Sequence, residues 1–491
     1  MNYTESSLEA EREAILARQE AASPLEPQAQ RRRELATKVF DYADAFLEKL
    51  PGMPGFVPGG EHTEVPLQLS EEPQSLEPLL QQLGATVDHF GINPASGAHL
   101  GYIPGGGVYP ASLGDYLADV FNRYSGINFA SPAAVELERQ LVTWMTGLVG
   151  YGEHAAGDLT SGGSIANLSA IVTAREAHNI RAADVPINCI YYTAQMHHCL
   201  TKAIGIAGLT EVQHRIVPMD AFHRMDAAAL EQQIIEDRRL GLRPWLVIGS
   251  AGTTDTGAVD PLDRLAGIAD RESMWLHVDG AYGAAFLLCE EGRRKLQGIE
   301  RADSIVMDPH KGLFLPYGSG AVLVREGHLL AKAFAYEANY MQDAVASESR
   351  PSPASLSPEL TRPFRGLRLW LPLRICGLAA FRACVEEKLM LARYFHRRIA
   401  ALPGFEAGPE PDLSVVTYRY VPEHGDTDDF NRRLVAAIQQ DGELFISSTM
   451  LDGRFVLRLA VLSFRTHLNH IERLLELLQE NAARLQCEGR V

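Results

Sequence analysis

Apolar residues recur at helical spacing in the first hundred positions of the chain. Between positions 31 and 50 they mark one face of a predicted helix: Leu35, Val39, Phe40, Ala43, Phe46 and Leu47. A break rich in Pro and Gly (PGMPGFVPGGEH) ends this helix, and a second helix is predicted from Glu77 to Phe90. Neither helix could bury its apolar face by itself. We therefore expect residues 1–110 to form a helical arm that packs on another surface.

Between about 110 and 325, short apolar runs alternate with helical stretches. The runs read NCIYYT, HRIVPM, WLVIGSAGTT, WLHVDGA, SIVMDP and GAVLVR. Such alternation predicts an α/β domain with a mostly parallel sheet and helices on both faces. In sheets of this kind the functional loops gather at the carboxyl ends of the strands, and these runs end in polar or glycine residues.

The last third of the chain is predicted to contain a mobile loop and a small α/β domain. Residues 338–363 are rich in Ser, Pro and Glu and show no periodicity, which indicates a long loop. A helix is predicted from about Gly366 to Ala401, and the order strand, helix, strand, helix over 412–485. The expected layout is an arm at 1–110, a large domain at 111–370 and a small domain at 371–491.

Composition narrows the classes of partner. The chain has 45 Lys and Arg against 62 Asp and Glu, a formal charge of −17, which disfavours nucleic acid or an anionic membrane surface. Six cysteines without metal or disulfide spacing predict neither a metal site nor a disulfide framework. The N-terminal stretch lacks the apolar core of a signal peptide, and no apolar run approaches the roughly 20 residues of a membrane span. We expect a cytoplasmic protein.

Two charged residues at strand ends are candidates for chemistry. Lys311 follows the apolar run SIVMDP, and Asp279 ends the run WLHVD. Most lysines are solvated surface charges, but desolvation at a strand end lowers the pKa of the amine and suits it to attack a carbonyl carbon. An aspartate in this position could cap a helix. Paired with the lysine, it could instead keep a pyridine nitrogen protonated.

A turn rich in Ser and Gly, TSGGSIAN at 160–167, leads into a helical run. The free backbone N–H groups and the dipole of a helix N-terminus favour a phosphate. This motif is weak by itself, since many loops have the same composition. The three motifs together describe a phosphate anchor, a partner for a pyridine nitrogen and a lysine for a Schiff base. They indicate a site for pyridoxal 5'-phosphate (PLP).

With these motifs the chain resembles the group II PLP-dependent amino-acid decarboxylases, which include aromatic-amino-acid, histidine, glutamate and cysteine-sulfinate decarboxylases. The resemblance covers roughly residues 30–485 and is carried by TSGGSIANL, HVDGAYGAAF, DPHKG, SPAAVELE and FRGLRLW. It implies a type I PLP fold and an obligate homodimer, with active sites at the dimer interface and the N-terminal arm packed across the partner subunit.

The resemblance also implies roles for individual residues. Lys311 matches the lysine that bonds to PLP, and Asp279 matches the partner of the pyridine nitrogen. His197 matches the histidine that stacks on the ring, with the neighbouring His198 as the alternative. The remaining matches are cofactor-binding positions and a stretch that lines the substrate pocket: Gly163, Ser164 and His310 at the phosphate, Ala281 at the ring, Thr254 or Thr253 nearby, and Tyr102, Ile103 and Pro104 in the pocket.

Three positions depart from the pattern of that family. Asp308 stands where the family often has Asn, which adds a carboxylate near the phosphate, and Gly312 replaces a bulkier residue. Enzymes of the aromatic branch place a tyrosine in the mobile loop to protonate the reacting carbon, but here Pro353 falls at that position. No tyrosine lies between Tyr340 and Tyr394, so a loop tyrosine is absent unless Tyr340 moves into the site, and His197 could serve as the proton donor instead.

The leading hypothesis is a decarboxylase that converts an L-amino acid to its amine and carbon dioxide. Loss of the loop tyrosine favours a second hypothesis on the same scaffold, a decarboxylation-dependent oxidase that forms an aldehyde, ammonia and hydrogen peroxide. A PLP lyase that cleaves a carbon–carbon bond and a catalytically silent PLP-binding relative are further options. The substrate is expected to be aromatic or of medium size rather than glutamate.

Overall fold

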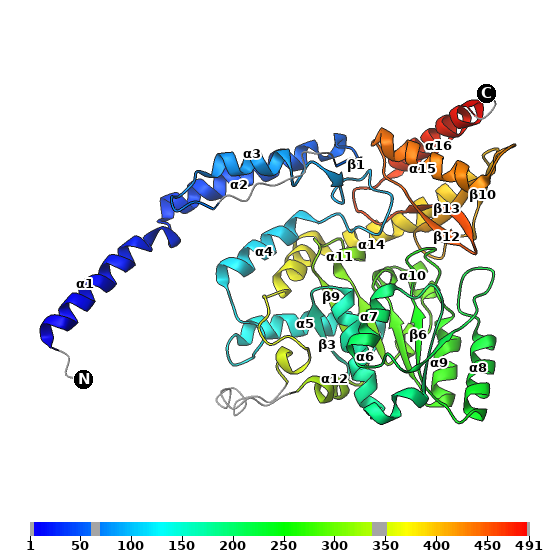
Figure 1. Ribbon diagram of the computed structural model, residues 1–491, viewed down its shortest axis with the longest axis horizontal. Helices are drawn as coiled ribbons and strands as arrows, with labels where there is room; N and C mark the ends of the chain where they lie inside the picture. The colour runs from blue at the N-terminus through cyan, green and yellow to red at the C-terminus, as the bar shows by residue number, and fades with distance from the viewer. Residues whose placement is uncertain (1–3, 60–68, 336–350, 489–491) are drawn as a thin grey trace. The chain divides into compact units, whose positions relative to one another are not determined.

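The computed structural model of the protein describes residues 4–59, 69–335 and 351–488 (Figure 1). The chain divides into a smaller unit within residues 1–91 and a larger unit formed by 54–56 and 92–491. The sequence placed the end of the arm at residue 110, whereas the larger unit begins at Ile92. The reason is that Leu100 is fully buried, and its N–H donates to the carbonyl of Phe445 at 2.8 Å.

The smaller unit consists of helices with no buried residue in the described range: α1 (Glu5–Ala21), α2 (Ala29–Lys49) and α3 (Leu76–Ala85). Lys38 on α2 forms an ion pair with Glu77 on α3, and the hydroxyl of Tyr42 donates to Asp88 at 2.5 Å. Side chains such as Val39 and Leu83 stay exposed. The apolar face predicted for the first helix is therefore only partly covered, since Leu35, Ala43, Phe46 and Leu47 are half-buried.

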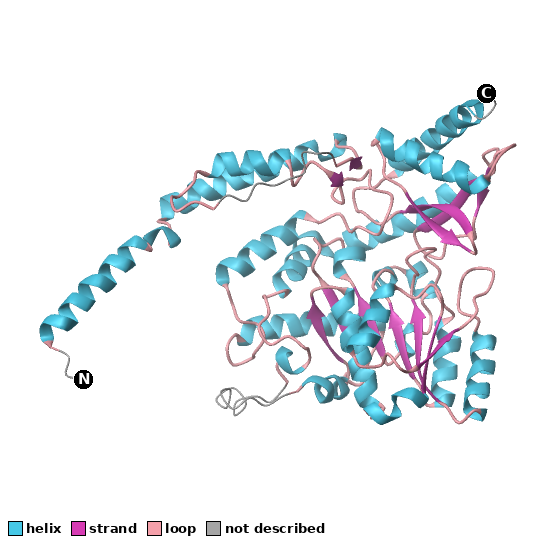
Figure 2. Cartoon of the chain, viewed as in Figure 1, coloured by secondary structure: helices cyan, strands magenta, loops and turns pink. Residues whose placement is uncertain are grey.

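A seven-stranded sheet forms the centre of the larger unit (Figure 2). Its strand order is β3-β9-β8-β7-β6-β4-β5, and only β9 runs antiparallel to its neighbours. The strands are β3 (Ala156–Thr160), β4 (Asn188–Tyr192), β5 (Gln213–Ile216), β6 (Arg243–Ser250), β7 (Trp275–Asp279), β8 (Ser304–Met307) and β9 (Gly320–Val324). The prediction of a mostly parallel sheet is confirmed. The prediction missed β3, because AGDLT contains a single large apolar residue.

Helices cover both faces of this sheet, as the sequence predicted. One face packs against α5, α8 and α9, and the other against α6, α7 and α12. Their bounds are α5 (Pro132–Val149), α6 (Gly163–Ala177), α7 (His198–Ile206), α8 (Ala227–Arg239), α9 (Leu262–Glu272) and α12 (Gly327–Phe334). Because both faces are covered, the central strands are apolar on both sides.

The twofold alternation of a strand decides which residues of β7 face which helices. Leu276 and Val278 point toward the α9 face, so Trp275, His277 and Asp279 point toward α6 and α7. Buried His277 and half-buried Asp279, the polar residues of an otherwise apolar strand, therefore lie on the side where α6 and α7 begin. This places Asp279 at the edge where those helices meet the loops.

Further helices complete the larger unit, and a second, smaller sheet lies in its C-terminal part. The antiparallel order is β10-β11-β13-β12, and the strands are β10 (Phe405–Ala407), β11 (Val415–Tyr420), β12 (Ser447–Leu451) and β13 (Arg454–Ala460). The accompanying helices are α4 (Tyr109–Phe121), α10 (Glu290–Lys295), α11 (Pro309–Gly312), α14 (Gly366–Ala400), α15 (Thr427–Asp441) and α16 (Leu468–Glu488). The strands β11 and β13 and the helices α15 and α16 were expected from the sequence, whereas β10 and β12 were not, and the boundary proposed at residue 371 falls inside α14. None of the helices in the described ranges combines the length and apolar character needed to span a bilayer.

The predicted mobile loop covers residues 338–363, of which 338–350 lie outside the described residues. From Ser352 onward the segment is anchored: Ser352 is 4% exposed, and Pro353 begins a buried 3-10 turn, η7 (Pro353–Ser355). Near its end the guanidinium of Arg362, which is 4% exposed, pairs with Glu138 of α5 at 2.7 Å and with Asp158 of β3. This ion-pair triad ties the segment to the edge of the sheet.

We predict that replacing Arg362 with Met lowers the free energy of unfolding by about 3–5 kcal/mol. The reason is that two buried carboxylates lose their cation. The matched control is Arg139→Met on the exposed face of α5, where Arg139 pairs with Glu136 and the expected change is below about 1 kcal/mol. Urea unfolding followed by circular dichroism measures both. Equal losses in the two variants would contradict a buried triad.

Candidate active site

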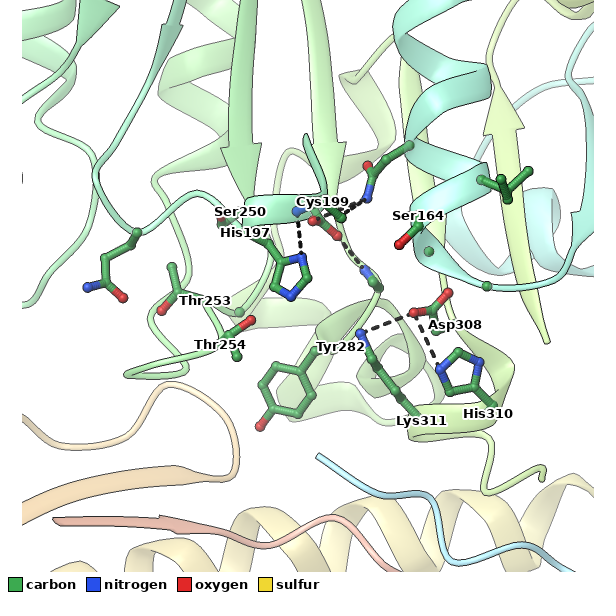
Figure 3. A pocket seen from close by; sticks show the side chains of 18 of the residues that line it. Ser164, His197, Cys199, Ser250, Thr253, Thr254, Tyr282, Asp308, His310 and Lys311 are labelled. Atoms are coloured by element: carbon green, nitrogen blue, oxygen red, sulfur yellow. Dashed lines mark hydrogen bonds and ion pairs between the residues drawn. The ribbon is translucent and has the colours of Figure 1, made fainter. Parts of the chain in front are cut away.

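A cavity of about 270 Å³ lies where several strands of the large sheet end (Figure 3). The loops that line it follow β3, β4, β6, β7 and β8. They lie at the carboxyl ends of the strands, where ligands bind in sheets of this kind. Its lining brings together the three motifs of the sequence: the turn 161–164, Asp279 and Lys311. The cavity is thus built from chain segments that are up to about 150 residues apart in the sequence.

Lys311 lies on α11, the single helical turn that follows β8. Its Nζ is 3.1 Å from Oδ2 of Asp308. Burial acts to lower the pKa of Lys311, but the carboxylates of Asp308 and Asp279 outweigh it and raise that pKa above its ordinary value. The next residue must be small, because a Cβ at Gly312 would lie 2.4 Å from the Cβ of Ala285. Gly312 therefore lets α11 pack tightly against η4 (Gly283–Leu288).

Asp279 is held by a chain of hydrogen bonds that runs into the core. The amide of Asn167 donates to Asp279 Oδ2 at 3.4 Å, and the backbone N–H of Ala281 donates to Oδ1 at 3.1 Å. The amide oxygen of Asn167 is 2.8 Å from Nε2 of His277, whose Nδ1 is 2.8 Å from the hydroxyl of Ser304. Burial lowers the pKa of His277 from 6.5 to about 4, so its ring is neutral near pH 7. Neutral His277 therefore donates through Nε2 and orients Asn167 toward the carboxylate.

The turn between β3 and α6 has the geometry of an anion site. Gly162 has a φ of +153°, a backbone conformation that favours glycine, and Gly163 begins the helix. The first N–H groups of a helix have no partner inside the helix, and they point outward with the positive end of the dipole. Gly163 and Ser164 line the cavity at this point. The turn can therefore bind a phosphate group.

His197 is the histidine of the pair that faces the cavity, whereas His198 is exposed and does not line it. His197 caps the N-terminus of α7, and the N–H of Cys199 donates to its Nδ1 at 3.3 Å. Burial lowers the pKa of His197, and the charge of Asp279 opposes that shift. In Figure 3 the side chains of His197 and Lys311 both point into the cavity.

The other predicted cofactor positions also line the cavity: Ala281, Thr253, Thr254 and His310. The hydroxyl of Thr253 forms a hydrogen bond with the hydroxyl of Thr256 at 2.7 Å, whereas Thr254 is more exposed. Nδ1 of His310 donates to the carbonyl of Ser319 at 2.5 Å, and its Nε2 lies 3.7 Å from Asp308. Burial lowers the pKa of His310, against the charge of Asp308.

The stretch predicted to line the substrate pocket is not part of this cavity. Tyr102 is 55% exposed and packs beside Phe445, Ile103 is half-buried against the core, and Pro104 is buried. The chain nevertheless passes close to the lysine, because a Cβ at Gly105 would lie 2.8 Å from the carbonyl of Lys311. The motif thus predicted that this stretch lies near Lys311, but it did not predict how the side chains of the stretch are oriented.

Sequence reasoning missed several residues of the cavity. Asn167, Cys199, Ser250 and Tyr282 all line it. Asn167 and Tyr282 lie inside motifs that were recognised, so a signal for them existed in TSGGSIANL and HVDGAYGAAF. No group of three or more His, Cys, Asp or Glu in the described ranges is arranged to hold a metal ion.

Comparison with known proteins identifies the class. The family model of the pyridoxal-dependent decarboxylase conserved domain matches residues 58–421, so the chain belongs to this family. The predicted family and its type I fold are confirmed. The chain is a PLP-dependent amino-acid decarboxylase, a carboxy-lyase, and the residues that line its cavity suit that cofactor in charge and geometry.

Individual relatives show how far the similarity extends. An aromatic-L-amino-acid decarboxylase of Bacillus atrophaeus is 36% identical over 372 residues, which cover 75% of this chain and 77% of that protein. A phenylacetaldehyde synthase of Arabidopsis thaliana is 27% identical, covering 89% and 92%. The crystal structure of Oryza sativa TDC with PLP and tryptamine superimposes with a TM-score of 0.88 at 26% identity, covering 94% and 99%.

The buried imidazole behind Asp279 predicts a pH dependence of stability. Because the pKa of His277 is about 4 in the folded chain and 6.5 when unfolded, its contribution is complete above pH 6.5 and is lost as the pH falls toward 4. Replacing His277 with Gln should reduce the acid sensitivity of the unfolding free energy by up to about 1.4 kcal/mol per pH unit in this window.

Urea unfolding of the cofactor-free protein at pH 6.5, 5.5 and 4.5 (about one pH unit apart across this window) measures the effect of His277→Gln. The matched control is His328→Gln on the surface, which should keep the slope of the parent. Some acid sensitivity should persist in His277→Gln, because burial also lowers the pKa of His99 to about 4. Identical slopes in the parent and His277→Gln would show that His277 is not buried as a neutral ring.

Proposed function

We propose that this decarboxylase acts on an aromatic L-amino acid and releases the corresponding amine and carbon dioxide. The observation that carries the proposal is the convergence of Lys311, Asp279 and the first turn of α6 on one cavity. An aromatic side chain is supported by the similarity to the aromatic-L-amino-acid decarboxylase of Bacillus atrophaeus. The same proposal assigns individual tasks to the residues around the cavity.

When bound, PLP supplies a ring that takes up the electron pair left by the departing carboxylate. Lys311 would hold the aldehyde carbon of the cofactor through its amine. Asp279, oriented by Asn167, would accept a hydrogen bond from the pyridine N–H and keep that nitrogen protonated. Gly163 and Ser164 would hold the phosphate through the helix N-terminus, with His310 beside them. Each task uses a group that lines the cavity.

His197 is the proposed proton donor to the substrate carbon. Its Nδ1 is occupied by the N–H of Cys199, so its other ring nitrogen faces the cavity (Figure 3). Ala281 and Thr254 are proposed to contact the cofactor ring from the same cavity. For the substrate side chain we propose the stretch Tyr102, Ile103 and Pro104, because Gly105 lies directly against the backbone of Lys311.

A second outcome of the same chemistry is supported by the sequence. Pro353, which stands where aromatic decarboxylases carry a loop tyrosine, has no proton to donate and is buried in η7. Tyr340 lies outside the described residues. A phenylacetaldehyde synthase is among the similar proteins. If His197 does not protonate the carbanion in time, reaction with dioxygen would yield an aldehyde, ammonia and hydrogen peroxide.

A turnover assay under air and under anaerobic conditions separates the two outcomes. The PLP-loaded protein is tested on the common amino acids, dopa and cysteine sulfinate, with carbon dioxide, amine and peroxide measured together. We expect carbon dioxide and equal amounts of amine in both atmospheres with an aromatic substrate. Peroxide that disappears without oxygen would assign the oxidase. Lys311→Ala should lose turnover by about a thousandfold or more, and full activity in this variant would contradict the site.

We propose that the protein forms a homodimer and that the arm contacts the second subunit. The support is apolar surface that neither unit covers: Leu79 and Leu83 on the arm, and Val120 and Phe121 on α4, are each 40% exposed or more. Surfaces of this kind mark protein–protein contacts. A homodimer would also give the arm the apolar partner that it lacks within its own unit.

Sedimentation velocity tests this proposal directly. We expect a single species with twice the 53.9 kDa mass of one chain. Introducing a charge by Phe121→Asp should shift the distribution toward monomer, because a buried unpaired charge opposes association. The matched control is Leu240→Asp on the far end of α8, which should leave the dimer intact. A monomeric parent would contradict the proposal.

The proposed location is the cytoplasm, with the amino acid and a second subunit as partners and no nucleic acid. The formal charge of −17 and six free cysteines support this. Reduced thiols are typical of that compartment.

A further inference from the structure

The carboxyl group of Asp308 is buried without a full set of partners. The side chain is 2% exposed at the end of β8, and Oδ2 lies 3.1 Å from Lys311 Nζ and 3.7 Å from His310 Nε2. Its other oxygen, Oδ1, has no hydrogen-bond partner anywhere in the described ranges. An unsatisfied buried carboxylate oxygen costs about 1–3 kcal/mol or more, so it is retained where a ligand or a proton completes it.

This carboxyl group lies directly against the anion-binding turn. A Cβ at Gly163 would be 2.8 Å from Asp308 Oδ2 and 3.2 Å from Oδ1. Gly163 is the first helical residue of α6, whose free N–H groups form the proposed phosphate site. Asp308 therefore stands where a second negative group would meet a bound phosphate.

Two anions side by side in a buried site are strongly unfavourable. A phosphate monoester carries about −1.5 to −2 charges near pH 7. When two acidic groups share a site, one of them keeps its proton. The single positive charge of Lys311 beside Asp308 does not offset both that carboxylate and a bound phosphate. Burial raises the pKa of Asp308, and the charges of Lys311 and His310 oppose that shift.

We propose that Asp308 takes up one proton from solvent when a phosphate monoester binds at the turn 161–164, and then donates its O–H to that phosphate. This inference rests on the proposed function of the turn as the PLP phosphate site. It makes Asp308 a neutral hydrogen-bond donor, whereas an ionised Asp308 would repel the ligand. Cofactor affinity then depends on pH through this one carboxyl group.

Other titratable groups face Asp308 and could compete for the proton. Lys311 and His310 lie within ion-pair distance of its carboxylate. Asp279, His197 and Cys199 interact with Asp308 electrostatically over a longer distance. His310 is the main competitor, because its Nε2 faces the carboxylate while Nδ1 is bonded to Ser319. The experiment must therefore separate Asp308 from His310.

The probe is 4-deoxypyridoxine 5'-phosphate, which has no aldehyde and so forms no bond with Lys311. Calorimetry in two buffers of different ionisation enthalpy counts the protons taken up per ligand bound. Three cofactor-free full-length proteins are compared: the parent, Asp308→Asn and His310→Gln. Asn has the shape of Asp but cannot titrate. Infrared difference spectra of the same samples detect the C=O stretch of a protonated carboxylic acid.

The parent and His310→Gln should each take up about one proton more than Asp308→Asn, and the carboxylic-acid band should be absent only from Asp308→Asn. As pH rises, affinity of the parent should fall about tenfold per pH unit relative to Asp308→Asn, because one proton is linked to binding. Equal proton uptake and equal pH slopes in the parent and Asp308→Asn would overturn the inference and leave the phosphate site standing.

Two other results would also overturn it. Loss of the extra proton in His310→Gln, with uptake retained in Asp308→Asn, assigns the proton to His310. Failure of all three proteins to bind the probe removes the phosphate site itself, and with it the proposed cofactor arrangement.

Discussion

A parallel sheet covered by helices on both faces has room for charged side chains only where its strands end. Every strand in the centre of this sheet is apolar on both sides, and the polar residues of β7 that break the rule are joined in hydrogen bonds. Because the strands run in one direction, their ends bring Asp279, Lys311 and the turn before α6 to one edge. The position of the active site follows from this constraint.

The charges at that edge act on one another because they are shielded from water. Asp308 and Asp279 raise the pKa of Lys311 against the effect of burial, while burial keeps His277 neutral. Neutral His277 can donate to Asn167, which in turn donates to Asp279. An imidazolium in the same place would be a buried charge without a counter-ion. The orientation of the Asp279 carboxylate therefore depends on His277, which is buried two residues earlier in the same strand.

The fate of the reaction depends on a different part of the chain. In the proposed mechanism, cleavage of the carboxylate requires only the cofactor and the groups that hold it, whereas the choice between amine and aldehyde would depend on how fast a proton reaches the substrate carbon. The segment after Ser352 is fastened to the sheet by Arg362 and contains no tyrosine, so His197 is the proposed donor.

The sequence by itself determined the sheet type, the cofactor and the three motifs that line the cavity, because periodicity and turn chemistry are local properties of the chain. It also singled out Lys311, Asp279 and His197. Only the tertiary structure decided that β3 closes the sheet beside the reversed strand β9. It also decided that His277 lies behind Asp279 and that Tyr102 packs beside Phe445 and does not line the cavity. These features depend on contacts between residues far apart in the chain, which no local pattern records.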